Sequence, residues 1–474
     1  MSDIDDVFAV LGFGKMQFIV LFCCLVLQIW ITNEQLGIGV VIAGATCELE
    51  IHDQRLAWLM AGNFSAQMIS CFLWGQMSDV YGRRSVILTT AIGSNILSIL
   101  SAFMPEYWSF LSLRMLAGFF LSASVVCCLT YLSEFTKISL RPRVLTIMSY
   151  AIGMSLIYVP SLAGAVLPLQ GKPSGWRILL LCNQVPGLIG IITLIFLPES
   201  PKYYLSVGNQ EKAMRVMERV CRMNKGKNVT LESLGVVSLT QPRLRHMSRP
   251  FDPCHDIKTL MTKYVKFMCI FSFVFFALSG LAFSLPIWML RIRVLTSHLT
   301  EHQTICDHLK GRTTSPSSGC YLSYREMEDP LIHGLVVLLL FIVTSLLLIC
   351  LNRRVVILLY VAIAIMGCVI LNFMKHPTLI LISFFAIIDP PMCTIRLTSS
   401  LLIDFLPTHL RGKAFAITTM MGRCGVLMTS LYVGYTLSHA CYVTFNVFIL
   451  VLLVCGILVY LLPAEYRNDS FTSG

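Results

Sequence analysis

Twelve apolar stretches of about 20 residues run through this chain of 474 residues, and they constrain its fold more than any other feature. A helix of about 20 apolar residues crosses the roughly 30 Å hydrocarbon core of a bilayer. Because only 13% of the residues are charged, the chain has too little polar surface to cover a water-soluble body of its size. The predicted fold is an all-α membrane protein with twelve transmembrane helices at 17–44, 55–77, 86–104, 108–132, 144–167, 176–198, 266–290, 331–351, 355–373, 377–403, 412–437 and 441–462.

The longest interruption between spans, 199–265, is polar and basic, and it divides the spans into six plus six. We therefore expect two bundles joined by a long loop. The predicted segments are a cytoplasmic N-terminus (1–16), an N-terminal six-helix bundle (17–198), a cytoplasmic loop with a short amphipathic helix (199–265), a C-terminal six-helix bundle (266–462) with an extracytoplasmic loop (291–330), and a cytoplasmic C-terminus (463–474).

The amphipathic helix of this loop is predicted from apolar residues at helical spacing within 208–223. Two favourable pairs four residues apart, Glu211 with Arg215 and Glu218 with Arg222, support it. We expect the helix to lie beneath the bundle and the remainder, 225–258, to be irregular.

Basic residues gather in the turns at 82–84, 141–143 and 352–354. The positive-inside rule places these turns, the long loop and both termini in the cytoplasm. The net charge of +11 then belongs to a cytosolic face beside anionic lipid. The expected partner is therefore the lipid bilayer and not nucleic acid, in the plasma membrane or an intracellular vesicle membrane.

The two halves of the chain repeat. Segment 79–88 aligns with 349–358, and 133–147 aligns with 403–417, both at an offset of 270 residues. The residues matched by this offset include Glu134 with Asp404 and Arg141 with Arg411. A shared offset at two separate places predicts two pseudo-symmetric six-helix repeats related by an axis along the membrane normal.

The strongest local motif is "GQMSDVYGRR", with Gly75, Asp79, Gly82, Arg83 and Arg84 between the second and third spans. We expect Gly75 to permit close helix approach and Gly82 to permit a tight turn. Asp79 can pair with a basic residue or a helix N-terminus. The motif resembles the loop motif of the major facilitator superfamily, in which such contacts bias a conformational equilibrium.

Other motifs extend the resemblance over nearly the whole chain. They are "LGFGK" (11–15), "GATCEL" (44–49), "YLSEF" (131–135), "LPESPKYYLSVG" (197–208), "DFLPTHLRGKA" (404–414) and "GRCG" (422–425). Together they are similar to the synaptic vesicle glycoprotein 2-like branch of that superfamily, which is related to the organic cation and anion transporters. The resemblance implies the major facilitator fold and a conformational switch that also involves Glu134, Arg141, Glu199, Asp404, Arg411 and Arg423.

Five charged residues lie inside predicted spans, away from the span ends: Glu34, Arg114, Asp389, Arg396 and Arg423. Charges in a bilayer are costly and usually face a cavity or one another. Asp389 and Arg396 are seven residues apart, on one face of a helix that two prolines between them should kink. We expect that face to line a cavity. For Arg114 and Arg423 a structural role is favoured.

The first span carries consecutive Asn33, Glu34 and Gln35. Gln35 shares a helical face with Gln28, whereas Glu34 lies about 100° away. One of these two faces should meet a cavity and the other a neighbouring helix, and we expect Glu34 to face the cavity. Two roles stay open for Glu34: binding a solute, proton or cation, or forming a structural ion pair with an arginine of another span.

The extracytoplasmic loop contains Cys306 and Cys320, which we expect to form a disulfide because that compartment is oxidising. No cysteine or histidine cluster in the sequence has metal-ligand spacing, so neither a metal nor a cofactor is expected. The sequence also lacks a nucleophile–base constellation, and we do not expect an enzyme.

Two functions remain open from the sequence. In the first, the protein is a secondary active transporter that moves a small organic, charged solute by alternating access, with a coupled proton or cation. Its candidate solute or proton site comprises Glu34, Gln35, Gln28, Asp389, Arg396 and Arg114. In the alternative, the protein is a non-transporting scaffold or receptor that retains the transporter fold. A channel is a weaker third option.

Overall fold

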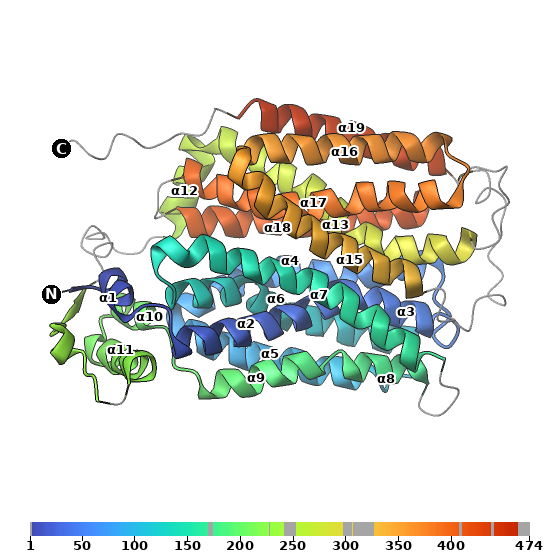
Figure 1. Ribbon diagram of the computed structural model, residues 1–474. Helices are drawn as coiled ribbons and strands as arrows, with labels where there is room; N and C mark the ends of the chain where they lie inside the picture. Colours follow the sequence, from blue (N-terminus) through green and yellow to red (C-terminus); the bar gives the residue numbers. More distant parts are fainter. Residues whose placement is uncertain are drawn as a thin grey trace. The chain divides into compact units, whose positions relative to one another are not determined.

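The computed structural model describes residues 2–168, 174–226, 228–240, 253–296, 306, 327–406, 410–437 and 440–462 (Figure 1). This part of the chain is nearly all helical, as predicted. Among the described residues, twelve helical segments are long and apolar enough to cross a membrane. Their bounds follow the predicted spans to within a few residues, because each is fixed by a long apolar run between polar turns.

The contacts divide the chain into two units. The first comprises Met1–Gly44, Ala66–Asp252 and Ser323–Leu338, and the second comprises Ala45–Ser65, Pro253–Leu322 and Leu339–Gly474. Two long helices, Asp53–Tyr81 and Glu328–Cys350, therefore contribute to both units.

The early part of the chain builds the first unit. Its elements and the complete helix α4 are β1 (Ser2–Asp3), α1 (Ile4–Leu11), α2 (Lys15–Thr32), η1 (Asn33–Gly37), α3 (Ile38–Ala45), α4 (Asp53–Tyr81), α5 (Arg83–Ser101), α6 (Tyr107–Glu134), η2 (Ile138–Leu140), α7 (Arg141–Val166), α8 (Gly175–Cys182), α9 (Val185–Phe196), α10 (Pro201–Ser206), α11 (Gln210–Lys225), η3 (Glu232–Leu234) and β2 (Leu239–Thr240). Helix α2 packs against α6, α7 and α9, and α5 packs along α6.

The later part builds the second unit. Its elements and the complete helix α15 are α12 (Pro253–Lys263), α13 (Val265–Thr296), α15 (Glu328–Cys350), α16 (Arg353–Phe373), α17 (Pro377–Phe405), α18 (Arg411–Thr436) and α19 (Cys441–Tyr460). Helices α13 and α18 approach very closely. A Cβ added at Gly425 would lie 2.1 Å from the carbonyl oxygen of Phe276, so the backbones touch where α18 has no side chain.

The core of the first unit continues beyond the membrane spans into the loop that follows α9. The apolar faces of α1 and α11 join the same buried cluster as α2, α6 and α7. The buried residues of α11 include Ala213, Val216, Met217 and Val220, which confirms the predicted amphipathic helix. Both predicted ion pairs on α11, Glu211 with Arg215 and Glu218 with Arg222, are also present.

The prediction that 225–258 is irregular was wrong in part. Strand β1 pairs in parallel with β2, with Ser2 opposite Leu239 and Asp3 opposite Thr240. Helix α12 also begins within that range, at Pro253. Pairing between residues so far apart in sequence has no local periodic signal, and two residues are too few to show strand alternation.

Candidate functional site

The first span, Lys15–Ala45, is interrupted by a short π-helical segment, η1. All five of its residues are buried. A π-turn inserts an extra residue into an α-helix and shifts the direction of its side chains. Asn33, Glu34 and Gln35 consequently meet three different sets of neighbours, so no polar side chain of this segment needs to face lipid.

Glu34 forms a buried ion pair with Arg114 of α6. Arg114 Nη2 lies 2.8 Å from Glu34 Oε2, and both side chains are only 2% exposed. Arg114 also donates from Nη2 to the backbone carbonyl of Glu34 at 3.4 Å. The alternative of a structural ion pair with an arginine of another span is the arrangement found here.

Two residues that the sequence analysis missed complete the surroundings of this pair. Ser98 of α5 donates to Glu34 Oε2 at 2.7 Å and accepts from Arg114 Nη1 at 2.8 Å. Gln184 donates from Nε2 to Glu34 Oε1 at 2.6 Å, and its own Oε1 accepts from Trp30 Nε1 at 3.0 Å. Serine and glutamine in apolar runs give only weak sequence signals, since they are uncharged and common in spans.

The prediction that Glu34 faces a cavity was wrong. Its two carboxylate oxygens accept from Arg114, Ser98 and Gln184, on helix α6, helix α5 and the turn before α9. A helical wheel drawn for a regular helix could show that Glu34 and Gln35 diverge, but it could not show which neighbours lie on each side.

The other polar residues of the first span bond elsewhere. Gln35 donates from Nε2 to Gln67 Oε1 of α4 at 2.9 Å. Asn33 accepts from Ser155 Oγ of α7 at 2.7 Å. Gln28 donates to Thr32 Oγ1 at 3.3 Å, one turn further along the same helix. Gln28 and Gln35 are thus separated from the Glu34–Arg114 pair.

In the second unit, α17 carries the other predicted acid and base. Asp389 is 1% exposed, and the helix continues through Pro390 and Pro391. Arg396 is half-buried on the same helix, and its guanidinium has no hydrogen-bond or ion-pair partner in the part of the chain that the structure describes. A cation without a carboxylate partner in a membrane span is costly unless a ligand or water compensates it.

Arg423 of α18 occupies an aromatic environment instead. Its guanidinium carbon lies 5.4 Å from the ring centroid of Phe64 and 5.7 Å from that of Phe283. Both distances suit cation–π attraction, which is strongest where water is excluded. The side chain is 8% exposed, and the expected structural role of Arg423 stays a prediction.

The loop motif between α4 and α5 forms a dense ion-pair network. Arg83 lies 2.8 Å from Asp79 Oδ1 and 3.1 Å from Glu134 Oε1 at the end of α6. Asp79 therefore pairs with a basic residue, as the motif predicted. The guanidinium of Arg83 also lies 5.7 Å from the ring centroid of Tyr203.

Glu199 caps the N-terminus of α5 from the connection between α9 and α10. Its carboxylate accepts from the backbone N–H of Arg84 at 2.9 Å and of Ser85 at 3.1 Å. A negative charge there also favours the positive end of the helix dipole. Gly82 precedes these amides with φ +98°, and a Cβ on it would lie 2.4 Å from Glu199 Oε2. The expected tight turn at Gly82 is confirmed.

Arg84 caps the C-terminus of α9. Its Nε and Nη2 donate to the carbonyls of Leu194 and Ile195, at 3.0 and 2.7 Å, in the last turn of α9. Unsatisfied carbonyls at a helix C-terminus favour a cation. The Glu199 and Arg84 side chains thus fasten the α5 and α9 ends to each other.

Arg141 joins a second cluster that includes the N-terminal helix. Asp5 Oδ1 accepts from Arg141 Nη2 at 3.0 Å and from Lys202 Nζ at 2.6 Å. Burial lowers the pKa of Lys202, and the hydrogen bond from Lys202 to Asp5 only partly opposes that shift. Asp5 is a residue that the sequence analysis missed, because nothing local marks it as a partner for groups more than 130 positions away.

Two further expectations for the switch motif have different outcomes. A Cβ on Gly75 would meet no atom within 4 Å, so the expected close helix approach at Gly75 was wrong for the described residues. Asp404 lies near the end of α17 and Arg411 begins α18, but their side chains lie outside the described part of the chain. Their pairing therefore stays a prediction.

Comparison with known proteins places this geometry in a family. The model of the family described as "Sugar (and other) transporter" matches residues 19–285, which is more than half of the chain. The chain belongs to the sugar (and other) transporter family. The matched region of this family member contains η1, the Glu34–Arg114 pair and the ion pairs of Arg83.

Named relatives of this family member agree with the expected resemblance. It is 28% identical over 331 residues to the synaptic vesicle 2-related protein of Xenopus laevis, covering 69% of this chain and 55% of that protein. It is 28% identical over 222 residues to the organic cation/carnitine transporter 7 of Arabidopsis thaliana, covering 47% and 43%. The chain spans about half the length of the curated relatives that it matches.

Solved structures establish the fold of this family member. The partially occluded inward-open xylose transporter XylE from E. coli matches with a TM-score of 0.71 and 12% identity, over 95% of this chain and 100% of that one. A second structure of XylE, described as a major facilitator superfamily proton:xylose symporter, matches with a TM-score of 0.66 and 14% identity, over 94% and 95%. The predicted major facilitator fold is confirmed.

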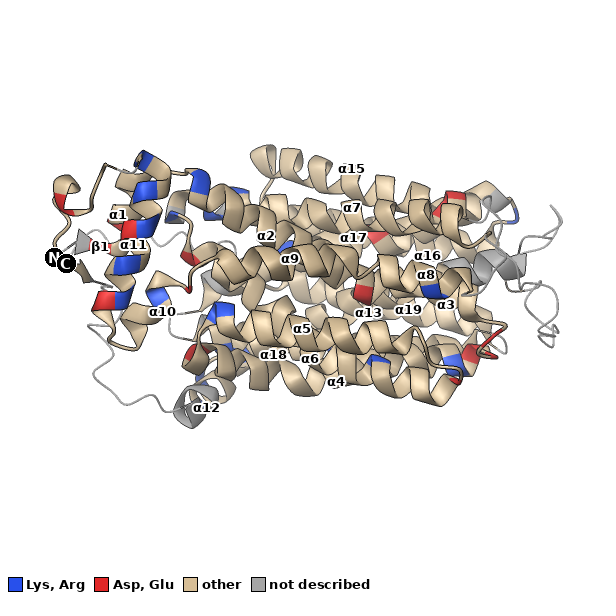
Figure 2. Cartoon of the chain, turned by 90° about the horizontal axis from the view of Figure 1, so that it is seen from below, with Lys and Arg blue, Asp and Glu red and all other residues tan. Residues whose placement is uncertain are grey.

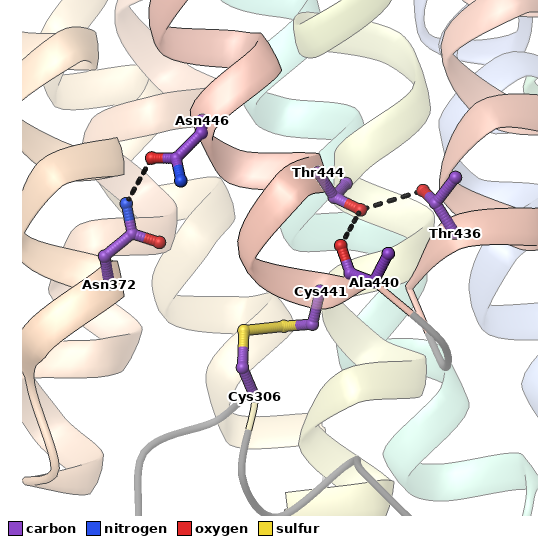
Figure 3. The surroundings of a disulfide bond; sticks show 7 residues. All are labelled: Cys306, Asn372, Thr436, Ala440, Cys441, Thr444 and Asn446. Carbon is purple, nitrogen blue, oxygen red and sulfur yellow. Dashed lines mark hydrogen bonds between the residues drawn. A yellow bond between two sulfur atoms is a disulfide. The ribbon is translucent and has the colours of Figure 1, made fainter.

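The second unit of this transporter-family chain contains a disulfide, but not the predicted one. Cys306 bonds to Cys441 at the start of α19, with the two Cα atoms 5.3 Å apart (Figure 3). The pairing of Cys306 with Cys320 was wrong, and Cys320 lies outside the described residues. Their shared place in an oxidising loop suggested Cys320, whereas the fold brings the start of the last span to Cys306.

Proposed function

We propose that the chain is a secondary active transporter that moves a small organic anion by alternating access and couples that movement to a proton. The observation that carries the proposal is the buried pair of Glu34 and Arg114 within the first and fourth spans. Family membership supports transport as the activity, and the structural similarity to XylE, a proton:xylose symporter, supports a proton as the coupled ion.

The pair gives a physical route for the coupling. While Glu34 is ionised, its charge compensates Arg114 in a buried site. A proton on Glu34 removes that compensation and leaves Arg114 as an excess positive charge in a spanning region. A negatively charged solute in the transport pathway would then be favoured, so protonation and solute binding would each strengthen the other.

The sign of the solute charge is argued from the buried charges of the spans. Glu34 already has a cationic partner, so it does not offer an uncompensated negative charge to a cation. Arg396 has no carboxylate partner among the described residues. We propose that Arg396 binds the anionic group of the solute, with Asp389 on the same helix orienting any cationic group of a zwitterion.

The loop network supplies the conformational part of the proposal. Arg83, Asp79 and Glu134 form one set of ion pairs, and Asp5, Lys202 and Arg141 form a second, as described above. We propose that both sets hold one state of the transport cycle and break in another, which would set the equilibrium between states. Asp404 and Arg411 are proposed as their counterparts in the second half.

We further propose that both termini and 199–265 face the cytoplasm, with the chain in the plasma membrane or a vesicle membrane. Basic turns support this orientation. The proposed division is an N-terminal bundle at 17–198 and a C-terminal bundle at 266–462.

Uptake into proteoliposomes under an imposed pH gradient tests the proposal. The solute panel should include organic anions, zwitterions such as carnitine, and xylose, because relatives carry these names. Glu34→Gln should abolish pH-driven accumulation per molecule of folded, reconstituted protein, and its unfolding midpoint is measured alongside because the variant leaves Arg114 unpaired. Arg396→Gln should raise the KM for the solute more than Arg396→Lys does. Glu106→Gln, at the exposed start of α6, is the matched control.

Normal pH-dependent uptake by Glu34→Gln would refute the proton route. Flux of cations but not of anions would refute the assigned solute charge. The absence of any solute flux across the panel would favour the non-transporting scaffold.

A further inference from the structure

The exposed face of α11 carries three arginines that are not part of the loop network or the proposed transport site. Arg215, Arg219 and Arg222 follow one another at intervals of four and three residues, so they share one face of the helix. With Glu218 and Met223 they line a groove of about 360 Å³. Figure 2 shows basic residues succeeding one another along α11.

This groove has an excess of positive charge. Its three arginines and one glutamate sum to a formal charge of +2, which becomes +1 when Glu211, the partner of Arg215, is counted. Arg215 and Arg222 each pair with a glutamate of the same helix, yet their side chains remain 74% and 57% exposed. Exposed ion pairs are weak, so the two guanidinium groups can leave their glutamates and bind an anion of higher charge.

The groove lies at the depth where a membrane span ends. Arg219 Nη2 donates to the carbonyl oxygen of Phe196 at 2.8 Å. Phe196 is the last residue of the span Gly175–Phe196, and its side chain is 70% exposed, as expected for a lipid-facing residue. Arg219 is therefore fixed to the level at which hydrocarbon gives way to lipid headgroups.

We propose that this groove binds the phosphorylated inositol headgroup of an anionic membrane lipid. Guanidinium groups match phosphate with paired hydrogen bonds, and several of them on one face suit a headgroup with more than one phosphate. A headgroup with several phosphates also offers more acceptor oxygens to the three guanidinium groups than the single phosphate of a serine lipid does. The volume also lies within the range of small-molecule sites. The choice of lipid rests on the proposed cytoplasmic placement of 199–265.

The apolar face of α11 is already buried against the first unit. A lipid in the groove would thus contact a helix that shares its core with α2 and α6, and binding should stabilise the whole unit against unfolding.

The experiment titrates purified full-length protein in detergent with dioctanoyl phosphatidylinositol bisphosphate and records the thermal unfolding midpoint. The midpoint should rise in a saturable way. Arg215→Gln/Arg222→Gln should weaken the apparent affinity by about tenfold or more. This double variant keeps the Arg219–Phe196 bond, so the protein should remain folded. Adding Arg219→Gln should weaken binding further.

The matched control is Lys212→Gln/Lys225→Gln, which removes the same charge from the same helix outside the groove. It should stay within about twofold of the wild-type affinity. An equal loss in this control, or no loss in the groove variants, would overturn the proposal. So would equally tight binding of dioctanoyl phosphatidylserine or of soluble inositol trisphosphate. Because the assay measures lipid binding in detergent, its result is independent of whether the protein transports a solute.

Discussion

Arg114 and Glu34 form an ion pair at 2.8 Å, with both side chains 2% exposed, in the interior of the first unit. Removing a pair of charges from water has a large desolvation cost that only close contact and further hydrogen bonds offset. Here Ser98 bonds to both partners, so the pair is held by groups from three different helices. The two charges should therefore be much less stable apart than together.

Replacing one member of the pair should destabilise the protein more than replacing both. Arg114→Met leaves a buried carboxylate without its cation and should lower the free energy of unfolding by about 3–5 kcal/mol. Glu34→Gln/Arg114→Met should recover much of that loss, because neither charge then remains. Thermal unfolding in detergent measures the difference.

The control for this pair is Arg55→Met. Arg55 pairs with Glu50 in a setting where the side chains are 37% and 78% exposed, and such a pair contributes about 1 kcal/mol or less. If the double variant were as unstable as Arg114→Met, the cost could not be assigned to an unpaired charge.

Two glycines of one motif should respond in opposite ways to alanine. Gly82 has φ +98°, and a Cβ on it would collide with Glu199. Gly82→Ala should therefore lower the free energy of unfolding by about 1–3 kcal/mol. Gly75 is helical with open space around it, so Gly75→Ala should leave stability unchanged or raise it by up to about 1 kcal/mol. Unfolding midpoints of the two variants, compared with wild type, give the test. Equal destabilisation by both would contradict the assigned contacts.

Glu199 should matter for stability far more than another glutamate of the same loop. Glu199→Ala frees two amides in the first turn of α5 and should lower the free energy of unfolding by about 2 kcal/mol. Glu211→Ala removes an exposed pair within α11 and should cost less than about 0.5 kcal/mol. Hydrogen exchange at the amides of Arg84 and Ser85 offers a local readout. Unchanged protection there in Glu199→Ala would show that Glu199 does not cap the helix.

The disulfide assignment can be checked directly by peptide mapping without reductant. The map should contain a peptide that joins Cys306 to Cys441. Cys441→Ser should expose the thiol of Cys306 to an alkylating reagent, whereas Cys320→Ser should leave it blocked. Alkylation of Cys306 in the Cys320→Ser variant would instead support the Cys306–Cys320 disulfide expected from the sequence.

Features with a local signature could be predicted from the sequence. The spans follow from long apolar runs, and the amphipathic helix with its two ion pairs follows from spacing within 16 residues. The basic partner of Asp79 and the turn at Gly82 also follow, because both belong to one short motif. The family resemblance could be recognised for the same reason, since each of its motifs is a short continuous segment.

Features that depend on distant parts of the chain could not be predicted. The choice of Arg114 as the partner of Glu34 spans 80 positions, and that of Cys441 as the partner of Cys306 spans 135. A regular helical wheel also fails where the helix is not regular, as at η1. Only the three-dimensional fold decides which of several chemically suitable partners lies within reach.

The contact between α1 and α11 has a consequence for biogenesis. The backbone N–H of Met16, in the first turn of α2, donates to Asn224 Oδ1 at 3.1 Å, across 208 positions of sequence. Asn224, which caps α2, and the apolar residues of α11 that pack against α1 leave the ribosome long after α1 itself. The first six spans are therefore synthesised before the N-terminus of the first span can form its hydrogen bond with Asn224. A nascent chain halted ahead of α11 should keep α1 accessible to protease or chaperone, and release past that point should protect it.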